Sequence, residues 1–259
     1  MAKKLPGLML GKRPAKQDRR TLKLETIIKN LPTIPDCFDF DADSQFKIPL
    51  PMFANDAWGD CVIAGRAHQT LRFETIDQQA LISISDQDVL QEYWHEQGGG
   101  RCWNKRPDNG LVVLDSLKSW RSGWKAGGHN YSIYAYGKIN PYNHDMAKAA
   151  IYLLSGVGAG LLLPLAAQNQ EVWEATEGDS GRTGSWGGHY VYIVGYTAIG
   201  PVCITWGQRK QMTWAFLDKY CDELWGIVDD KNYWPLSSYI DIVRLNDYLN
   251  SVSQGVCHD

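Results

Sequence analysis

One cysteine stands where a turn-rich stretch gives way to a helical pattern. In NDAWGDCVIAGRAHQTL, the dipeptides Asn-Asp, Trp-Gly and Gly-Asp indicate turns, and the residues after Cys61 follow helical spacing. The N-terminus of a helix stabilises negative charge and therefore favours the thiolate, which is the nucleophilic form of cysteine. Buried cysteines are common and usually inert, so position alone makes Cys61 only a candidate nucleophile.

A cysteine nucleophile needs a base, and His189 is the best placed of six histidines. It lies in GSWGGHYVYIVGYT, after two glycines that permit close approach and at the start of an apolar strand that gives rigid support. The alternative is a histidine that only ends a strand. The sequence contains no HExxH or HxxxH spacing and no CxxC pair, so neither a metal site nor a cofactor is expected.

An acyl-transfer site also needs donors for the developing oxyanion. The backbone N–H of Cys61 is one candidate, because N–H groups at a helix start lack intrahelical acceptors. The side-chain amide of Asn55, six residues earlier, is the second. The alternative role for Asn55 is an ordinary Asx turn with Asp56.

With these residues in place, the chain resembles the papain-like cysteine peptidases in a divergent bacterial or phage form. That family carries Q-G-x-C-G-x-C-W around its nucleophile, and residues 55–61 stand in the same frame, with Gly59 kept. The family glutamine is replaced by Asn55, and a structural cysteine of the family falls on Trp58. The separation of Cys61 from His189 also fits the roughly 130 residues typical of a papain-type pair.

The resemblance runs over about residues 32–229. Five further segments match family segments in the family's order: SISDQDVLQEYW, DNGLVVLDSLKSW, INPYNHDMAKAAIYLLSGVGAGLLLP, GGHYVYIVGYT and VCITWG. The family's orienting asparagine falls on Ile204, whose side chain accepts no hydrogen bond, and Thr205 is the nearest polar substitute. No inhibitory pro-region is recognisable in the short stretch before the match.

The resemblance assigns roles to particular residues. It implies a Cys61 nucleophile, a His189 base, an oxyanion contact from Asn55 and an orienting role for Thr205. The residues that it implies along the substrate groove are Trp58, Gly59, Gly99, Trp186, Gly188 and Trp206. The substrate would be a peptide or a protein, including a cell-wall peptide or an isopeptide.

The expected fold is α+β and two-lobed. Helical patterns dominate about residues 55–130, and short apolar strands between glycines dominate about 131–229. The resemblance makes these a helical lobe and an antiparallel β-barrel-like lobe, with the active site between them. Residues 31–229 would form the catalytic domain, 1–30 a basic and flexible N-terminal arm, and 230–259 a C-terminal helical extension.

Composition limits the remaining choices. The net charge is −3 and the sequence pI is about 6.1, which gives no general attraction to nucleic acid. No apolar stretch is long enough to span a bilayer, and the start lacks the apolar run of a secretory signal. We therefore expect free thiols and a cytoplasmic or particle-associated protein, with the basic arm as the contact for any assembly partner.

Two other functions fit the same residues. The first is a papain-like fold that serves as a structural or interaction component of a phage particle or a secretion assembly. Ile204 and the missing pro-region favour it. The second is a cysteine-based transferase or amidase that acts on a small amide.

Overall fold

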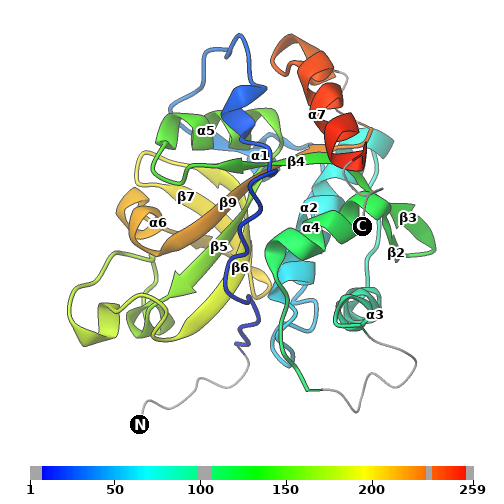
Figure 1. Cartoon of the computed structure of the whole chain (residues 1–259). Helices are drawn as coiled ribbons and strands as arrows, with labels where there is room; N and C mark the ends of the chain where they lie inside the picture. The colour runs from blue at the N-terminus through cyan, green and yellow to red at the C-terminus, as the bar shows by residue number, and fades with distance from the viewer. Residues whose placement is uncertain (1–7, 99–106, 232–234, 255–259) are drawn as a thin grey trace.

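The computed structural model describes residues 8–98, 107–231 and 235–254, and these form two lobes side by side (Figure 1). One lobe is mainly helical and the other is built on an antiparallel sheet. The two-lobed α+β fold predicted from the sequence is thereby confirmed.

The helical lobe contains three helices and a short ribbon of two strands. Its elements are α2 (Cys61–Gln78), α3 (Asp86–Glu96), α4 (Val113–Ser122), β2 (Trp124–Ala126) and β3 (His129–Tyr131). Ser85 and Asp88 form a capping box at the start of α3, where each side chain bonds the other residue's backbone N–H.

The second lobe is a seven-stranded sheet in which all strand pairs are antiparallel. The strands are β1 (Phe38–Asp39), β4 (Ile133–Ile139), β5 (Val157–Leu163), β6 (Gly187–Tyr196), β7 (Pro201–Thr205), β8 (Gln208–Gln211) and β9 (Cys221–Asp229). Their order is β4-β9-β5-β6-β7-β8, with β1 added on β6. Within the described chain β4 and β8 stay unjoined, so the sheet is open and does not close into a barrel.

Helices outside the helical lobe cover the sheet and its ends (Figure 1). They are α1 (Phe40–Asp43), α5 (His144–Leu153), α6 (Trp214–Tyr220) and α7 (Ile242–Gln254). The N-cap residues Asn143 of α5 and Thr213 of α6 accept hydrogen bonds from Met146 N–H and Phe216 N–H. None of the helices in the described ranges has the length and apolarity that a membrane crossing requires.

Helix α2 is buried on all sides from Cys61 to Thr75, although this stretch contains several polar and charged residues. The reason is that its polar residues have partners inside the protein. Arg66 bonds Glu92 and Ser116, and Arg72 bonds Asp41. Charged side chains can be buried when they are paired in this way. Helix α2 can therefore lie between the sheet and the other helices with almost none of its surface exposed.

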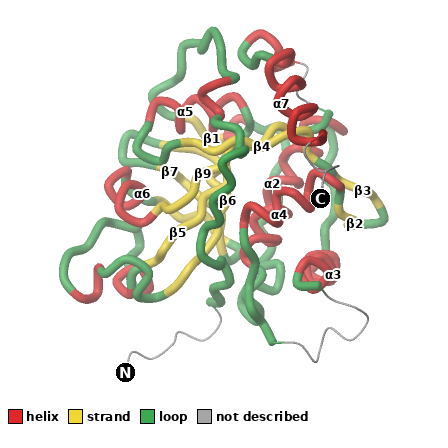
Figure 2. The backbone as a smooth tube through the Cα atoms, viewed as in Figure 1, coloured by secondary structure: helices red, strands yellow, loops and turns green. Residues whose placement is uncertain are grey.

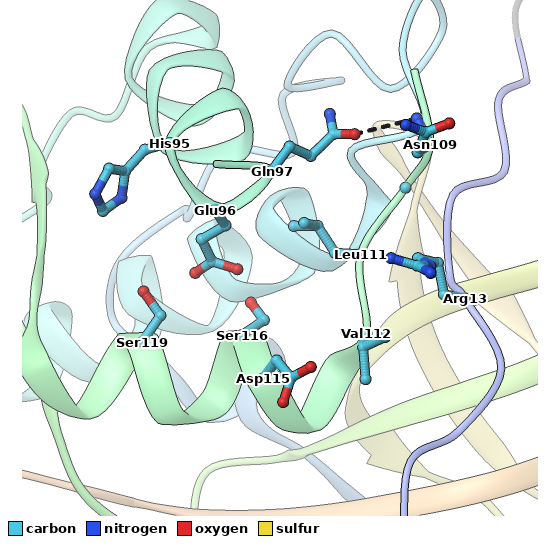
Figure 3. Close-up of a pocket in the computed structure, with 11 residues that line it drawn as sticks. Arg13, His95, Glu96, Gln97, Asn109, Leu111, Val112, Asp115, Ser116 and Ser119 are labelled. Atoms are coloured by element: carbon cyan, nitrogen blue, oxygen red, sulfur yellow. Dashed lines mark hydrogen bonds between the residues drawn. The ribbon is translucent and has the colours of Figure 1, made fainter. Parts of the chain in front are cut away.

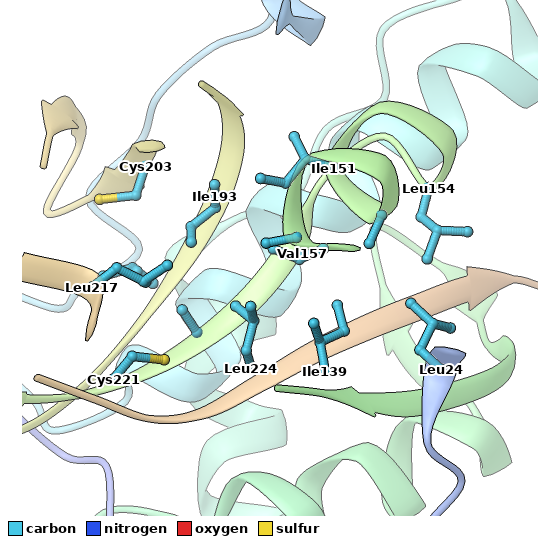
Figure 4. Close-up of a cluster of buried hydrophobic side chains, with 14 of the residues drawn as sticks. Leu24, Ile139, Ile151, Leu154, Val157, Ile193, Cys203, Leu217, Cys221 and Leu224 are labelled. Carbon is cyan, nitrogen blue, oxygen red and sulfur yellow. The ribbon is translucent and has the colours of Figure 1, made fainter. Parts of the chain in front are cut away.

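Each lobe has its own apolar core. The larger core lies in the sheet lobe, where side chains of α5, β5, β9 and the N-terminal residue Leu24 meet (Figure 4). The other joins α2, α3 and α4 to the ribbon. Because each core stabilises its own lobe, the start of α2 in one lobe and the start of β6 in the other have defined positions.

Residues 8–30 do not form the free arm that the sequence suggested. Leu24 and Ile27 are buried in the core of the sheet lobe. The residues before them run as an extended chain between the two lobes, as Figure 2 shows. The expectation of a flexible arm is therefore wrong for this stretch, because its apolar side chains and its backbone both find partners.

Candidate active site

Cys61 is the first residue of α2, as predicted, and is 1% exposed. Burial raises the pKa of its thiol to about 12, although hydrogen bonds from the backbone of Tyr190 and Gly11 favour the thiolate. Tyr190 follows His189 on β6, so the contact brings the strand of the candidate base against the helix start. In this state the thiol is protonated at neutral pH.

His189 lies near the start of β6, opposite Leu161 of β5, and is fully buried. Its Nε2 lies 2.6 Å from the hydroxyl oxygen of Thr205. Its Nδ1 has no hydrogen-bond partner in the described part of the chain. Burial lowers the pKa of the imidazole to about 3, so the ring is neutral at neutral pH.

The indole of Trp206 covers the His189 ring. The two rings stack with centroids 4.1 Å apart and planes 14° apart, and Trp186 packs on Trp206 at 5.5 Å. This stack keeps water from one face of the imidazole and holds the ring in one orientation.

Thr205 and Ile204 occupy neighbouring positions of β7, and strand geometry sends their side chains to opposite faces. Ile204 packs with Tyr192 and Val194 in a small apolar cluster. Thr205 therefore faces His189, although the family frame would put the polar residue one position earlier.

Asn55 and Asp60 form a buried polar pair just before Cys61. The Asn55 side-chain N–H groups donate to the Trp58 carbonyl and to Asp60 Oδ1, both at 2.9 Å. Burial raises the pKa of Asp60 well above its usual range. Both amide hydrogens are thus in use, and Asn55 is not a free oxyanion donor in this state.

The other residues predicted for the groove belong to several separate segments. Gly59 donates its N–H to Asp108 Oδ2 at 2.8 Å, and Trp58 packs edge-on against Trp94. Gly188 accepts a backbone hydrogen bond from Lys12 at 3.1 Å. Gly99 lies outside the described residues.

The N-terminal segment, residues 8–13, runs directly through this site. Met9 N–H donates to the Asn55 carbonyl, and Leu111 N–H donates to the Gly11 carbonyl. Trp206 Nε1–H donates to the Met9 carbonyl at 3.1 Å. Gly11 lies so close to Gly59 that a Cβ on it would be 1.6 Å from the Gly59 carbonyl oxygen, so only glycine fits.

The segment pairs with Leu111 as a parallel bridge. The Gly11 carbonyl accepts from Leu111 N–H, and Arg13 N–H donates to the Leu111 carbonyl at 2.8 Å.

The cleft segment, as we call residues 8–13, was not predicted from the sequence. Its only signal was a short glycine-bearing basic stretch, LGKR, which composition assigned to a flexible arm.

A separate cavity of about 360 Å³ opens between α3 and α4, beside the cleft segment (Figure 3). Glu96, Asp115 and Ser116 line it from the helices, and Arg13 lines it from the segment. None of the residues predicted for catalysis borders this cavity. It is therefore distinct from the candidate reaction centre.

Comparison with solved structures identifies the fold. Xylellain, a cysteine protease from Xylella fastidiosa, superposes with a TM-score of 0.61 at 16% identity, over 88% of this chain and 99% of that one. Procathepsin B S9 from Trypanosoma congolense superposes with a TM-score of 0.59 at 13% identity, over 86% of this chain and 87% of that one. A Carica candamarcensis cysteine protease in complex with E-64 superposes with a TM-score of 0.52 at 15% identity, over 76% of this chain and 99% of that one.

These similarities show that the chain has the fold of the papain-like cysteine proteases, as the sequence motifs indicated. No family model matches the chain, and no curated protein matches its sequence. The fold is therefore shared with these proteins at a level of identity that says nothing about activity.

Proposed function

We propose that this protein is a cysteine-type peptidase in which Cys61 is the nucleophile and His189 is the general base. One observation carries the proposal. Within a papain-like fold, the cysteine at a helix start is contacted by the backbone of Tyr190, the strand neighbour of a histidine that is held by a hydroxyl and stacked under an indole.

The chemistry follows from these positions. His189 takes the Cys61 proton, and the thiolate attacks the carbonyl carbon of the scissile amide. The backbone N–H of Cys61 stabilises the oxyanion, and Asn55 can add a second bond only after releasing Trp58 or Asp60. The imidazolium then protonates the leaving amine. Finally, His189 deprotonates a water that hydrolyses the thioester.

The described state is the resting form in this scheme. The cleft segment excludes water from the site, and burial keeps both the thiol and the imidazole neutral. A substrate reaches Cys61 only when the segment leaves. The water that enters then lowers the desolvation cost of a thiolate–imidazolium pair.

The first experiment measures the pH dependence of iodoacetamide alkylation at each cysteine by mass spectrometry. It compares the parent with Gly11→Ala, which cannot keep the segment against Gly59, and with Gly11→Ala/His189→Ala. We expect Gly11→Ala to speed Cys61 labelling below pH 7 and His189→Ala to abolish the gain. Cys37, which is exposed, serves as the internal reference thiol.

Peptide cleavage by the same variants completes the test. Gly11→Ala is incubated with a denatured protein, and the new termini are read by mass spectrometry, with Cys61→Ser added as the inactive control. Labelling of Cys61 at the rate of an ordinary thiol, together with no new termini, would contradict the peptidase assignment.

A second function is supported by the dry and neutral state of the site. A papain-like fold that acts as a structural component needs no ion pair, and a site closed by its own chain suits that role. Under this alternative, Gly11→Ala would expose Cys61 without making it reactive below pH 7.

A further inference from the structure

The lysine of the cleft segment is buried along its whole side chain. The Lys12 side chain is 0% exposed, and its Nζ lies 2.8 Å from Asp222 Oδ2 and 3.2 Å from Glu223 Oε1. Lysine is almost never fully buried unless its charge is paired. The protein therefore contains a pocket that is shaped and charged for a basic side chain.

The walls of this pocket fit an aliphatic stem that carries a positive end. A Cβ at position 160 would lie 2.2 Å from Lys12 Cε, so Gly160 provides the space through which the stem passes. At the far end, Glu223 is fully buried, and Trp225 Nε1–H donates to its Oε2 at 3.0 Å. This bond holds the Glu223 carboxylate in place without neutralising it.

Lys12 leaves part of the acceptor capacity of the pocket unused. Asp222 Oδ1 is buried and has no hydrogen bond within the described residues, and Glu223 Oε1 lies no nearer than 3.2 Å to the Lys12 ammonium. An ammonium carries three donors, and here one contact goes to the Arg13 carbonyl at 3.3 Å. A guanidinium offers five donors in a planar fork, so arginine suits the two carboxylates better than the lysine that is present.

The main chain of the occupant is held by backbone groups that an incoming peptide can also use. Lys12 N–H donates to the Gly188 carbonyl, and its neighbours pair with Leu111. An extended peptide adds to such an edge through backbone bonds, while pockets for its side chains supply specificity. Gly11, the residue next to Lys12, is the one whose backbone bonds Cys61.

We propose that the acidic pocket, formed by Gly160, Asp222 and Glu223, selects arginine or lysine in a peptide substrate. The selected residue is the neighbour of the residue held at Cys61, and Lys12 is the internal occupant of the same pocket. This inference rests on the proposed peptidase function. It adds the substrate class, namely peptides with a basic residue next to the residue that is held at Cys61.

The test uses the full chain with Lys12→Ala, which empties the pocket. A set of internally quenched peptides differs at one position, occupied by arginine, lysine, citrulline or norleucine. Citrulline has nearly the shape of arginine but no charge. We expect arginine peptides to be cut at least tenfold faster than citrulline peptides, with lysine between them. Adding Glu223→Gln or Asp222→Asn should reduce the arginine-to-citrulline ratio about tenfold.

Glu174→Gln is the matched control, because it removes an exposed carboxylate elsewhere in the sheet lobe and should leave the ratio unchanged. Thermal unfolding of each variant identifies any that fails to fold. Asp222→Asn, at the more exposed carboxylate, remains informative if Glu223→Gln is unstable. Equal cleavage of arginine and citrulline peptides, or a ratio unaffected by both substitutions, would overturn the pocket assignment while leaving the peptidase intact.

A binding measurement distinguishes failure of the peptidase proposal from failure of the pocket proposal. Cys61→Ser/Lys12→Ala is titrated with dye-labelled arginine and citrulline peptides, and fluorescence anisotropy gives their affinities. If no peptide is cut, tighter binding of the arginine peptide that is lost in Glu223→Gln supports the pocket without the chemistry. Equal affinities would reject the pocket as well.

Discussion

In the helical lobe, Arg66 and Arg72 lie buried on α2 and pair with carboxylates from other parts of the folded body. In the sheet lobe, the buried Glu223 pairs with Lys12, which arrives on the cleft segment. Both arrangements satisfy a buried charge. The first has partners that cannot leave without unfolding the lobe, whereas the second has a partner on an extended strand that a peptide can replace.

This difference separates structural ion pairs from exchangeable ones. Arg66 also donates to the Ser116 carbonyl at 2.7 Å and its guanidinium lies 5.4 Å from the ring centre of Trp120, so it is tied to α4 at several points. Lys12 is tied by its own side chain and by backbone bonds that any extended chain can form. Removing a buried arginine of the helical lobe should therefore destabilise the fold, whereas removing Lys12 should release the cleft segment and leave the fold in place.

The largest effect is expected for Arg66→Met. It leaves Glu92 and Glu96 buried without their cation and should lower the free energy of unfolding by about 3–5 kcal/mol in urea denaturation. Arg66→Met/Glu92→Met/Glu96→Met removes the charges together and should recover most of the loss. A cost below about 1 kcal/mol for the single variant would mean that this cluster is as replaceable as the Lys12 pair.

Lys12→Ala should cost less, about 2 kcal/mol, because Asp222 is 22% exposed and water can enter the emptied pocket. Burial raises the pKa of Glu223 and Lys12 opposes that rise, so its removal raises the pKa further. The folded variant then holds a proton that the unfolded chain releases, and its stability falls more steeply as pH rises above about 4.5.

The same variant should make Cys61 alkylate at least tenfold faster, since the cleft segment loses its anchor. Lys16→Ala, which breaks an ion pair between two half-exposed side chains, is the control and should change neither stability nor labelling measurably. Faster labelling in Lys16→Ala would show that surface charges, rather than the buried pair, hold the segment.

The two buried histidines provide a pH test that spans both lobes. Burial lowers the pKa of His189 to about 3 and that of His68 well below 6.5, so the unfolded chain binds more protons at both positions below about pH 6.5. Their contribution to stability is present above pH 6.5 and is lost as the pH falls, by up to ~1.4 kcal/mol per pH unit for each proton.

Urea denaturation at pH 7 and pH 4.5 measures this loss. His189→Gln and His68→Gln should each flatten the pH dependence, and His129→Gln, at an exposed position on β3, should not. In the Gly11→Ala background the His189 contribution should shrink while that of His68 persists, because only His189 gains water when the segment opens.

The smallest effect is expected for Thr205→Val, measured in the Lys12→Ala background. It removes one hydrogen bond to His189 and should lower kcat about tenfold with KM unchanged. Thr205→Ser, which keeps the hydroxyl, should restore the rate. A change in KM with kcat unaffected, or no rescue by Thr205→Ser, would mean that Thr205 fills space without orienting the imidazole.

Much of the fold was predictable because local rules and tertiary structure agree there. The side-chain caps Ser85, Asn143 and Thr213 directly precede α3, α5 and α6, and the apolar runs between glycines became β5, β6 and β7. Helix α2 was less predictable in character. Its buried arginines depend on carboxylates up to 31 residues away, a distance over which no periodicity carries information.

By itself, the sequence determined that Cys61 begins a helix and that His189 lies near the start of a strand, since turn residues and apolar alternation specify both locally. It also carried the order of motifs that resembles the papain-like peptidases. The sequence also named Thr205 as the polar substitute for the orienting residue, but only the tertiary structure brought its hydroxyl to His189, because the packing of β7 decides which of its faces turns toward β6. Only the tertiary structure decided that Lys12 lies between Asp222 and Glu223, since residues about 210 positions apart meet only when both lobes have folded around the segment.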